Sequence, residues 1–135
     1  MNFHRRRPRW RRLRRQQRYP LRPEWVPQTM VDLDPACVER FDRFNAMRRE
    51  VAPGARLPVE TEVLLVLDGA GMVTVWTAPT ERVEATRVGR LTGAAVGAYE
   101  TVLAELDRDL APIAWLTASE LAPGQYQAFV EGHPL

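Results

Sequence analysis

The sequence predicts an α+β fold, in which a small antiparallel sheet of four to five strands carries two amphipathic helices on one face and follows an extended Arg-rich N-terminal arm. Three observations lead to this prediction. The first 22 of the 135 residues are strongly basic. Two later segments repeat apolar residues with the period of an α-helix, and several strand-like segments follow one another directly. A chain of this length holds one domain with one core.

Residues 1–22 form the basic segment. They contain ten Arg and no acidic residue, whereas residues 23–135 contain nine Arg and 17 acidic residues, so the two parts carry charges of +10 and −8. Because the segment has few apolar residues and its like charges repel, we expect it to be disordered unless it is bound to a partner. Residues 23–33 contain Pro23 and Pro27 and are expected to form a linker or a strap laid on the body.

The single domain is expected over residues 34–131, followed by a tail over residues 132–135 in which His133 is solvated. A first helix is predicted from Asp34 to about Glu50, since Asp34 is a suitable N-cap and the proline after it suits the first helical position. The apolar residues of this helix recur three or four positions apart, which places them on one face. They are Cys37, Phe41, Phe44, Met47 and Val51.

A β-hairpin is predicted next. Residues 62–67 are rich in Val and Leu, residues 68–71 have the composition of a turn, and residues 72–77 alternate apolar and polar side chains. Because the first of these strands is apolar at every position from Val63, we expect it to be central or covered on both faces. Residues 81–88 alternate weakly and are expected to form a third, edge-like strand.

A second helix is predicted over residues 93–110, where Thr92 is a suitable N-cap. Its apolar stripe consists of Ala95, Tyr99, Val102, Leu103, Leu106 and Leu110. Residues 113–117 and 125–130 are expected to form two further strands. A Thr-x-x-Glu pattern predicts a short helical turn over residues 117–120.

The last strand contains an aromatic residue on its outer side. Alternation points Tyr126, Ala128 and Val130 toward the core, and it turns Phe129 outward beside Gln127. An exposed aromatic side chain on a terminal strand is typical of a dimer or partner surface.

The arm is the clearest candidate for a binding site. Arg presents a planar fork of donors to phosphate oxygens and stacks on bases, so Arg residues interleaved with aromatic residues suit nucleic acid, RNA in particular. The expected phosphate contacts are Arg5, Arg6, Arg7, Arg9, Arg11, Arg12, Arg14, Arg15 and Arg18, with Trp10 and Tyr19 stacking on bases.

Three other interpretations of the arm stay open. It would also suit an acidic protein surface, and less well an anionic membrane, because its apolar anchors are few. The third is that residues 1–29 are not part of the natural protein. All 19 basic residues are Arg and Ile occurs once, which indicates a GC-rich bacterial or phage genome. In such a genome, sequence upstream of a true start also encodes Arg and Pro, and Met30 stands just before the first helix.

No catalytic, cofactor or metal site is predicted. Asp68-Gly-Ala-Gly lacks the third glycine of a dinucleotide fingerprint, and a strand follows it instead of a helix. The single Cys37 excludes an internal disulfide, and its place on an apolar stripe predicts a buried side chain rather than a nucleophile. The only two His residues lie near opposite ends of the chain, which argues against a zinc site. Acidic pairs such as Glu60 and Glu62 are expected to be solvated.

The expected function is that of a non-enzymatic accessory protein. Its arm would bind nucleic acid or another polyanion, and its acidic body would dock to a protein partner or to a second copy, with Trp25 and Phe129 at the interface. The alternative is a structural subunit of a larger assembly, for example a phage particle, whose arm is a protein-docking strap. No apolar run approaches the roughly 20 residues that cross a bilayer, so a cytoplasmic location is expected, or one within a particle assembled there.

Overall fold

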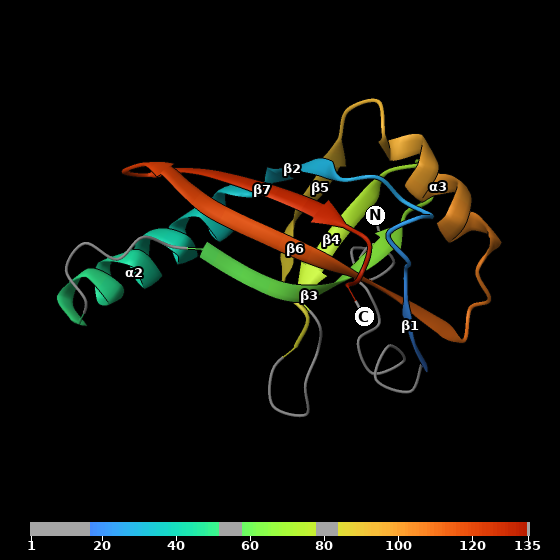
Figure 1. The fold of residues 1–135 in the computed structure, drawn as a ribbon, viewed down its shortest axis with the longest axis horizontal. Coiled ribbons are helices and arrows are strands. Elements are labelled where there is room, and N and C mark those ends of the chain that lie inside the picture. The colour runs from blue at the N-terminus through green and yellow to red at the C-terminus, as the bar shows by residue number, and fades with distance from the viewer. Residues whose placement is uncertain (1–16, 52–57, 78–83, 135) are drawn as a thin grey trace, which may run out of the picture.

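The structure, a computed structural model, describes residues 17–51, 58–77 and 84–134. These residues form seven strands and two helices, and six of the strands close into a barrel (Figure 1). In chain order the elements are β1 (Gln17–Pro20), β2 (Thr29–Leu33), α2 (Pro35–Val51), β3 (Pro58–Leu67), β4 (Val73–Thr77), β5 (Arg87–Thr92), α3 (Val96–Glu105), β6 (Leu110–Ala122) and β7 (Gln125–Glu131).

The barrel is antiparallel, and its strand order is β6-β3-β4-β5-β2-β7. The pairing of β7 with β6 closes the ring. One edge of β6 pairs with β3, and the other edge serves two neighbours in turn, because its first residues pair in parallel with β1 and its later residues pair with β7. β1 is therefore an extra strand, laid against the start of β6 outside the closed ring.

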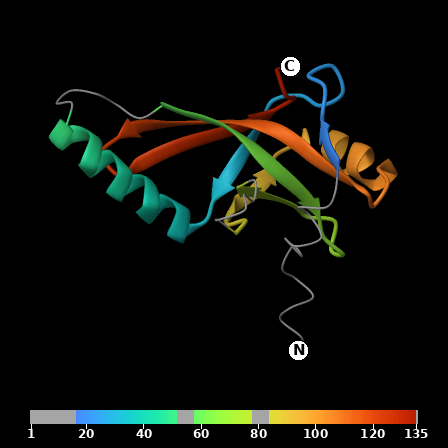
Figure 2. The same ribbon diagram turned by 90° about the horizontal axis from the view of Figure 1, so that it is seen from below.

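The predicted open sheet of four to five strands with both helices on one face is wrong. β1 and β2 come from segments that we assigned to the arm and the linker, and β2 completes the ring by pairing with both β5 and β7. The two helices lie at opposite ends of the barrel (Figures 1 and 2). Closure gives each of the six strands a partner on both sides, which an open sheet denies to its two edge strands.

Alternation along β3 explains how one strand serves two apolar clusters. Val63 and Leu65 point into the barrel and are fully buried in the main core. Leu64 points to the outer side, where it is buried in a second cluster with Ala111 and Ile113 of β6. The prediction that this strand is covered on both faces is therefore confirmed.

The predicted helices and hairpin are present with changed bounds. The first helix covers Pro35–Val51, and the second covers only Val96–Glu105, because Leu110 begins strand β6. β3 and β4 form the predicted hairpin. The Asp68 carboxylate accepts hydrogen bonds from two backbone N–H groups of the connection, so this segment is a hairpin turn.

The last two predicted strands lie within one long hairpin, β6–β7. Residues 113–117 and 125–130 are confirmed as strand, but the helical turn predicted over residues 117–120 is wrong, because these residues pair with residues 126–129. The pairing with β7 gives the backbone N–H and C=O groups of these residues hydrogen-bond partners, so they do not need the side-chain caps of a helical turn. The strand predicted over residues 81–88 begins later, as β5, and the start of the predicted range lies outside the described residues.

Candidate functional site

β1 fixes the end of the predicted arm to the barrel. The N–H of Gln17 donates to the carbonyl oxygen of Asp109, and the N–H of Leu21 donates to that of Ile113, both at 2.9 Å. Leu21 is fully buried in the main core. β1, Leu21 and β2 are therefore packed in or on the barrel.

Glu62 of β3 connects β1 to the C-terminal tail. We call Arg18, Glu62 and the residues around them, where the arm meets the barrel, the root of the arm. The Glu62 carboxylate forms an ion pair with Arg18 of β1, and its Oε1 lies 2.8 Å from Nε2 of His133. Burial alone would raise the pKa of Glu62, but the hydrogen bonds from His133 and Arg18, together with their charges, lower it overall. Glu62, expected to be solvated, is thus a bridging residue.

The tail is part of the body as well. The N–H of His133 donates to the carbonyl oxygen of Leu21 at 2.6 Å, and Figure 2 shows the C-terminus beside the segment that follows β1. The His133 side chain is 12% exposed and meets the ring of Trp115 edge-on, so the expectation of a solvated His133 is wrong. Gly132 lies so close to Pro23 that an added Cβ would be 2.3 Å from the Pro23 backbone, which only glycine permits.

Two aromatic residues proposed for binding, Tyr19 and Trp25, contact each other. The rings of Tyr19 and Trp25 stack with centroids 5.9 Å apart, and the guanidinium of Arg22 lies over the Trp25 ring. Tyr19 and Arg18 are therefore engaged within the body. The remaining predicted nucleic-acid contacts lie outside the described residues; they are Arg5, Arg6, Arg7, Arg9, Trp10, Arg11, Arg12, Arg14 and Arg15.

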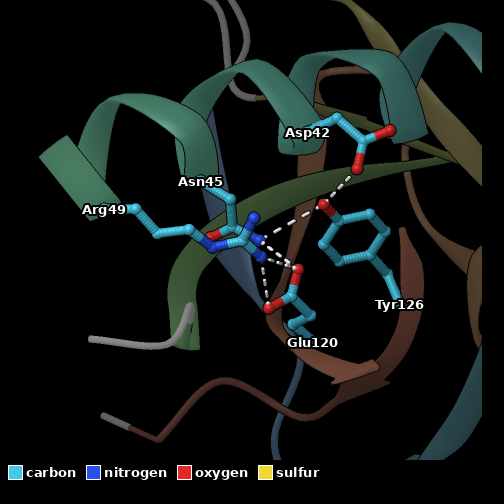
Figure 3. Close-up of polar contacts among 5 residues, drawn as sticks. All are labelled: Asp42, Asn45, Arg49, Glu120 and Tyr126. Carbon is cyan, nitrogen blue, oxygen red and sulfur yellow. Dashed lines mark hydrogen bonds and ion pairs between the residues drawn. The ribbon is translucent and has the colours of Figure 1, made fainter. Parts of the chain in front are cut away.

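A polar cluster holds α2 against the β6–β7 hairpin (Figure 3). Glu120 of β6 accepts hydrogen bonds from Asn45 at 2.9 Å and from Arg49 at 2.9 and 3.0 Å. Asn45 also donates to the Tyr126 hydroxyl at 3.2 Å, and this hydroxyl donates to Asp42. Asn45 is 3% exposed and the Glu120 side chain 7%, so the cluster is largely shielded from water. We call these five residues the clasp.

The clasp is built to hold rather than to react. Burial and the hydrogen bond to Asp42 raise the pKa of Tyr126, so the phenol keeps the proton that it donates. The buried Glu120 carboxylate is paired with a guanidinium and an amide, the partners that make burial of a charge tolerable. The rings of Phe41 and Tyr126 pack edge to face beside these bonds, with centroids 5.4 Å apart.

The apolar face of α2 points away from the clasp. Asp42, Asn45 and Arg49 face the hairpin, and each is followed two positions later by an apolar residue, which lies about 200° further around the helix. These apolar residues, Phe44, Met47 and Val51, are 45%, 67% and 86% exposed. Only the start of the predicted apolar stripe, at Cys37 and Phe41, packs on the barrel.

Phe129, predicted to face outward at a partner interface, lies on the outer side of β7 and is half-buried. It stands opposite Met30 of β2 on one side and opposite Thr117 of β6 on the other. Trp25, the other predicted interface residue, is bound to Tyr19 at the root of the arm. The two residues thus take part in separate contacts.

The described residues offer little for catalysis or metal binding. Burial raises the pKa of Cys37, as for an apolar core residue. Within the described ranges, no group of three or more His, Cys, Asp or Glu is placed to hold a metal ion. No helix in this part of the chain is long and apolar enough to span a bilayer.

Comparison with protein-family models, with curated proteins and with solved structures found no match. The function of the chain is therefore inferred from its own residues. Sequence reasoning missed His133 as a tail anchor and the clasp of α2. The only local signal for the clasp was the spacing of Asp42, Asn45 and Arg49, which places three polar side chains on one helical face.

Proposed function

We propose that this chain is a non-enzymatic accessory protein that binds nucleic acid, or a similar polyanion, through residues 1–16, while its body docks to protein. The observation that carries the proposal is the separation of charge. Residues 1–16 hold eight Arg and no acidic residue, whereas residues 17–135 hold 11 Arg and 17 acidic residues. The two parts therefore attract partners of opposite charge.

The attachment of the basic segment supports this division of labour. Residues 1–16 lead directly into β1, which is hydrogen-bonded along β6, and Arg18 is held there by Glu62. Polyanion binding is thus assigned to the arginines before Gln17, with Trp10 available to stack on an unpaired base. We place this activity in the cytoplasm, or in a particle assembled there.

The test is a binding titration with single-stranded RNA and duplex DNA over a series of salt concentrations. The full chain is compared with a chain that begins at Gln17, which keeps β1 and buried Leu21. If about six guanidiniums neutralise DNA phosphates, the log-log salt slope is roughly −5, and it falls to near zero in the shortened chain. Equal affinity of the two chains would rule out the proposal.

A matched set of variants separates local charge from total charge. Replacing Arg5, Arg6 and Arg7 by Gln is expected to weaken binding and lower the salt slope by up to about 3. Replacing the exposed Arg22, Arg90 and Arg108 by Gln changes the net charge equally but leaves residues 1–16 unchanged. Equal losses in the two sets would mean that the whole surface, and not the arm, attracts the nucleic acid.

A second candidate function is that of an interaction subunit in a larger assembly, with the arm docked on an acidic protein surface. The exposed apolar residues Phe44, Met47 and Val51 favour it, because a helix held rigidly by a clasp presents them to a partner. In this case nucleic acid competes poorly with the protein partner for the arm.

A further inference from the structure

We propose that a second copy of this chain docks on the apolar stripe of α2, with the two helices antiparallel and related by a two-fold axis beside Met47. The stripe is defined as Phe44, Met47 and Val51. The inference rests on the proposal that the body docks to protein and names the partner; nucleic-acid binding by the arm is independent of it.

The spacing of the stripe is self-complementary. In an antiparallel pair centred on Met47, residues three or four positions before the centre face residues three or four positions after it. Phe44 then faces Val51 of the second copy, and Met47 faces Met47. Each large side chain meets an apolar one, as a seam between two helices requires.

The charges beside the stripe fit the same arrangement. Arg43 and Glu50 are seven positions apart, so they lie only about 20° apart around the helix and share one flank of the stripe. The antiparallel pairing brings Arg43 of one copy to Glu50 of the other, twice across the two-fold axis. Neither residue has an ion pair within the described part of the chain.

The other charges of α2 are largely engaged within the chain. Arg49 is bound to Glu120, Asp42 accepts from Tyr126, and Arg40 donates to a backbone carbonyl of β5. Arg48 lies over the Phe44 ring. Beside the stripe, the charges without an ion pair in the described part of the chain are Arg43 and Glu50, one of each sign, which suits a second copy of the same helix; the exposed Glu39 lies two turns before Met47.

The exposed area sets the expected strength of the contact. From the exposed fractions of the three side chains, each copy offers roughly 350 Å² of apolar surface, taking about 150–200 Å² for a fully exposed side chain of this size. A standard stable interface buries about 800 Å² on each partner. We therefore expect a reversible dimer whose population rises with protein concentration.

The experiment is sedimentation velocity of the nuclease-treated full chain over a concentration series, with charge-reversal variants. Arg43→Glu and Glu50→Arg each place like charges across the two-fold axis and are expected to raise the dissociation constant of the dimer at least tenfold. The double variant restores the pairs and is expected to return the constant to within threefold of the original. Circular dichroism confirms that each variant folds.

An apolar pair of variants provides the matched control. Met47→Gln is expected to weaken the dimer, whereas Met30→Gln, the same change at a half-exposed site on the barrel, is expected to leave it unchanged. A chain that stays monomeric, or a dimer that ignores the α2 variants, would overturn the inference.

Hydrogen exchange separates failure of this inference from failure of the docking proposal. If the chain is monomeric and the amides in the second half of α2 are protected from exchange, the proposed dimer is wrong. The ordered, exposed stripe would then still support docking to another protein. A monomer in which this half exchanges like unfolded chain overturns both.

Discussion

The two helices carry similar apolar patterns and use them in opposite ways. α3 buries Tyr99 and Leu103 in the barrel core, with Val102 partly buried beside them. α2 is longer, yet only its Cys37 and Asn45 are buried, and the side chains of Phe44, Met47 and Val51 are exposed to water. α3 is thus held by apolar packing, and α2 is held by the hydrogen bonds and ion pair of the clasp.

The difference shows that an apolar stripe marks a face that benefits from leaving water, without saying what covers it. For α3 the cover is the barrel, where the Tyr99 hydroxyl lies 2.6 Å from the carbonyl oxygen of Pro27 and 3.1 Å from that of Val130. Burial, with a smaller effect of Glu131, raises the pKa of Tyr99 well above its ordinary value. For α2 we infer that the cover is another chain.

The largest expected effect is at Tyr99. Tyr99→Ala removes the largest fully buried side chain of the core and is expected to lower the free energy of unfolding by about 3–5 kcal/mol, measured by urea denaturation. Tyr99→Phe keeps most of the volume and is expected to cost about 1–2 kcal/mol. A loss below 1 kcal/mol for Tyr99→Ala would mean that α3 is not anchored in the core.

The clasp is expected to matter less, and locally. Glu120→Ala removes one of the two acceptors of buried Asn45 and the ion pair of Arg49, so we expect a loss of about 2 kcal/mol in the protection of α2. Hydrogen exchange measures this protection. β3 and β4 serve as the internal control, because equal losses there would show global destabilisation rather than release of the helix.

The root of the arm provides a pH-dependent effect of about 0.5–1 kcal/mol, since the pair is partly exposed. The folded pKa of Glu62 lies below its ordinary value, because the hydrogen bonds and charges of His133 and Arg18 outweigh the effect of burial. Its contribution to stability is therefore present above the unfolded pKa and is lost as pH falls through the folded pKa. Below about pH 5, the original chain is expected to lose more stability on acidification than Glu62→Gln. Parallel thermal-unfolding profiles would contradict this.

The smallest effect is expected on the exposed stripe. At a concentration where the chain is monomeric, Met47→Ala is expected to change the free energy of unfolding by no more than about 0.5 kcal/mol. Leu103→Ala, on α3, is the matched core change and is expected to cost about 2–4 kcal/mol. Similar losses of unfolding free energy in the two variants would mean that the α2 stripe is as buried as the apolar face of α3.

Much of the local structure could be predicted from short-range patterns. The spacing of Cys37, Phe41 and Phe44 predicted α2, and the Val-rich run before Asp68 predicted β3 and its turn. The basic segment was also evident, but not its end. β1 has only four residues, and its partner residues in β6 lie over 90 positions away in the sequence. No local pattern therefore predicted this strand.

The sequence by itself determined which faces of the helices and strands are apolar, where the main turns fall and how charge divides between the first residues and the body. Those properties depend on neighbours within one or two turns of the chain. Only the tertiary structure decided that β2 meets β7 and closes the ring, and that Arg18, Glu62 and His133 come together across separations of 44 and 71 residues. Contacts at such separations depend on which edges the whole fold brings side by side, and the energy that selects them is spread over many residues.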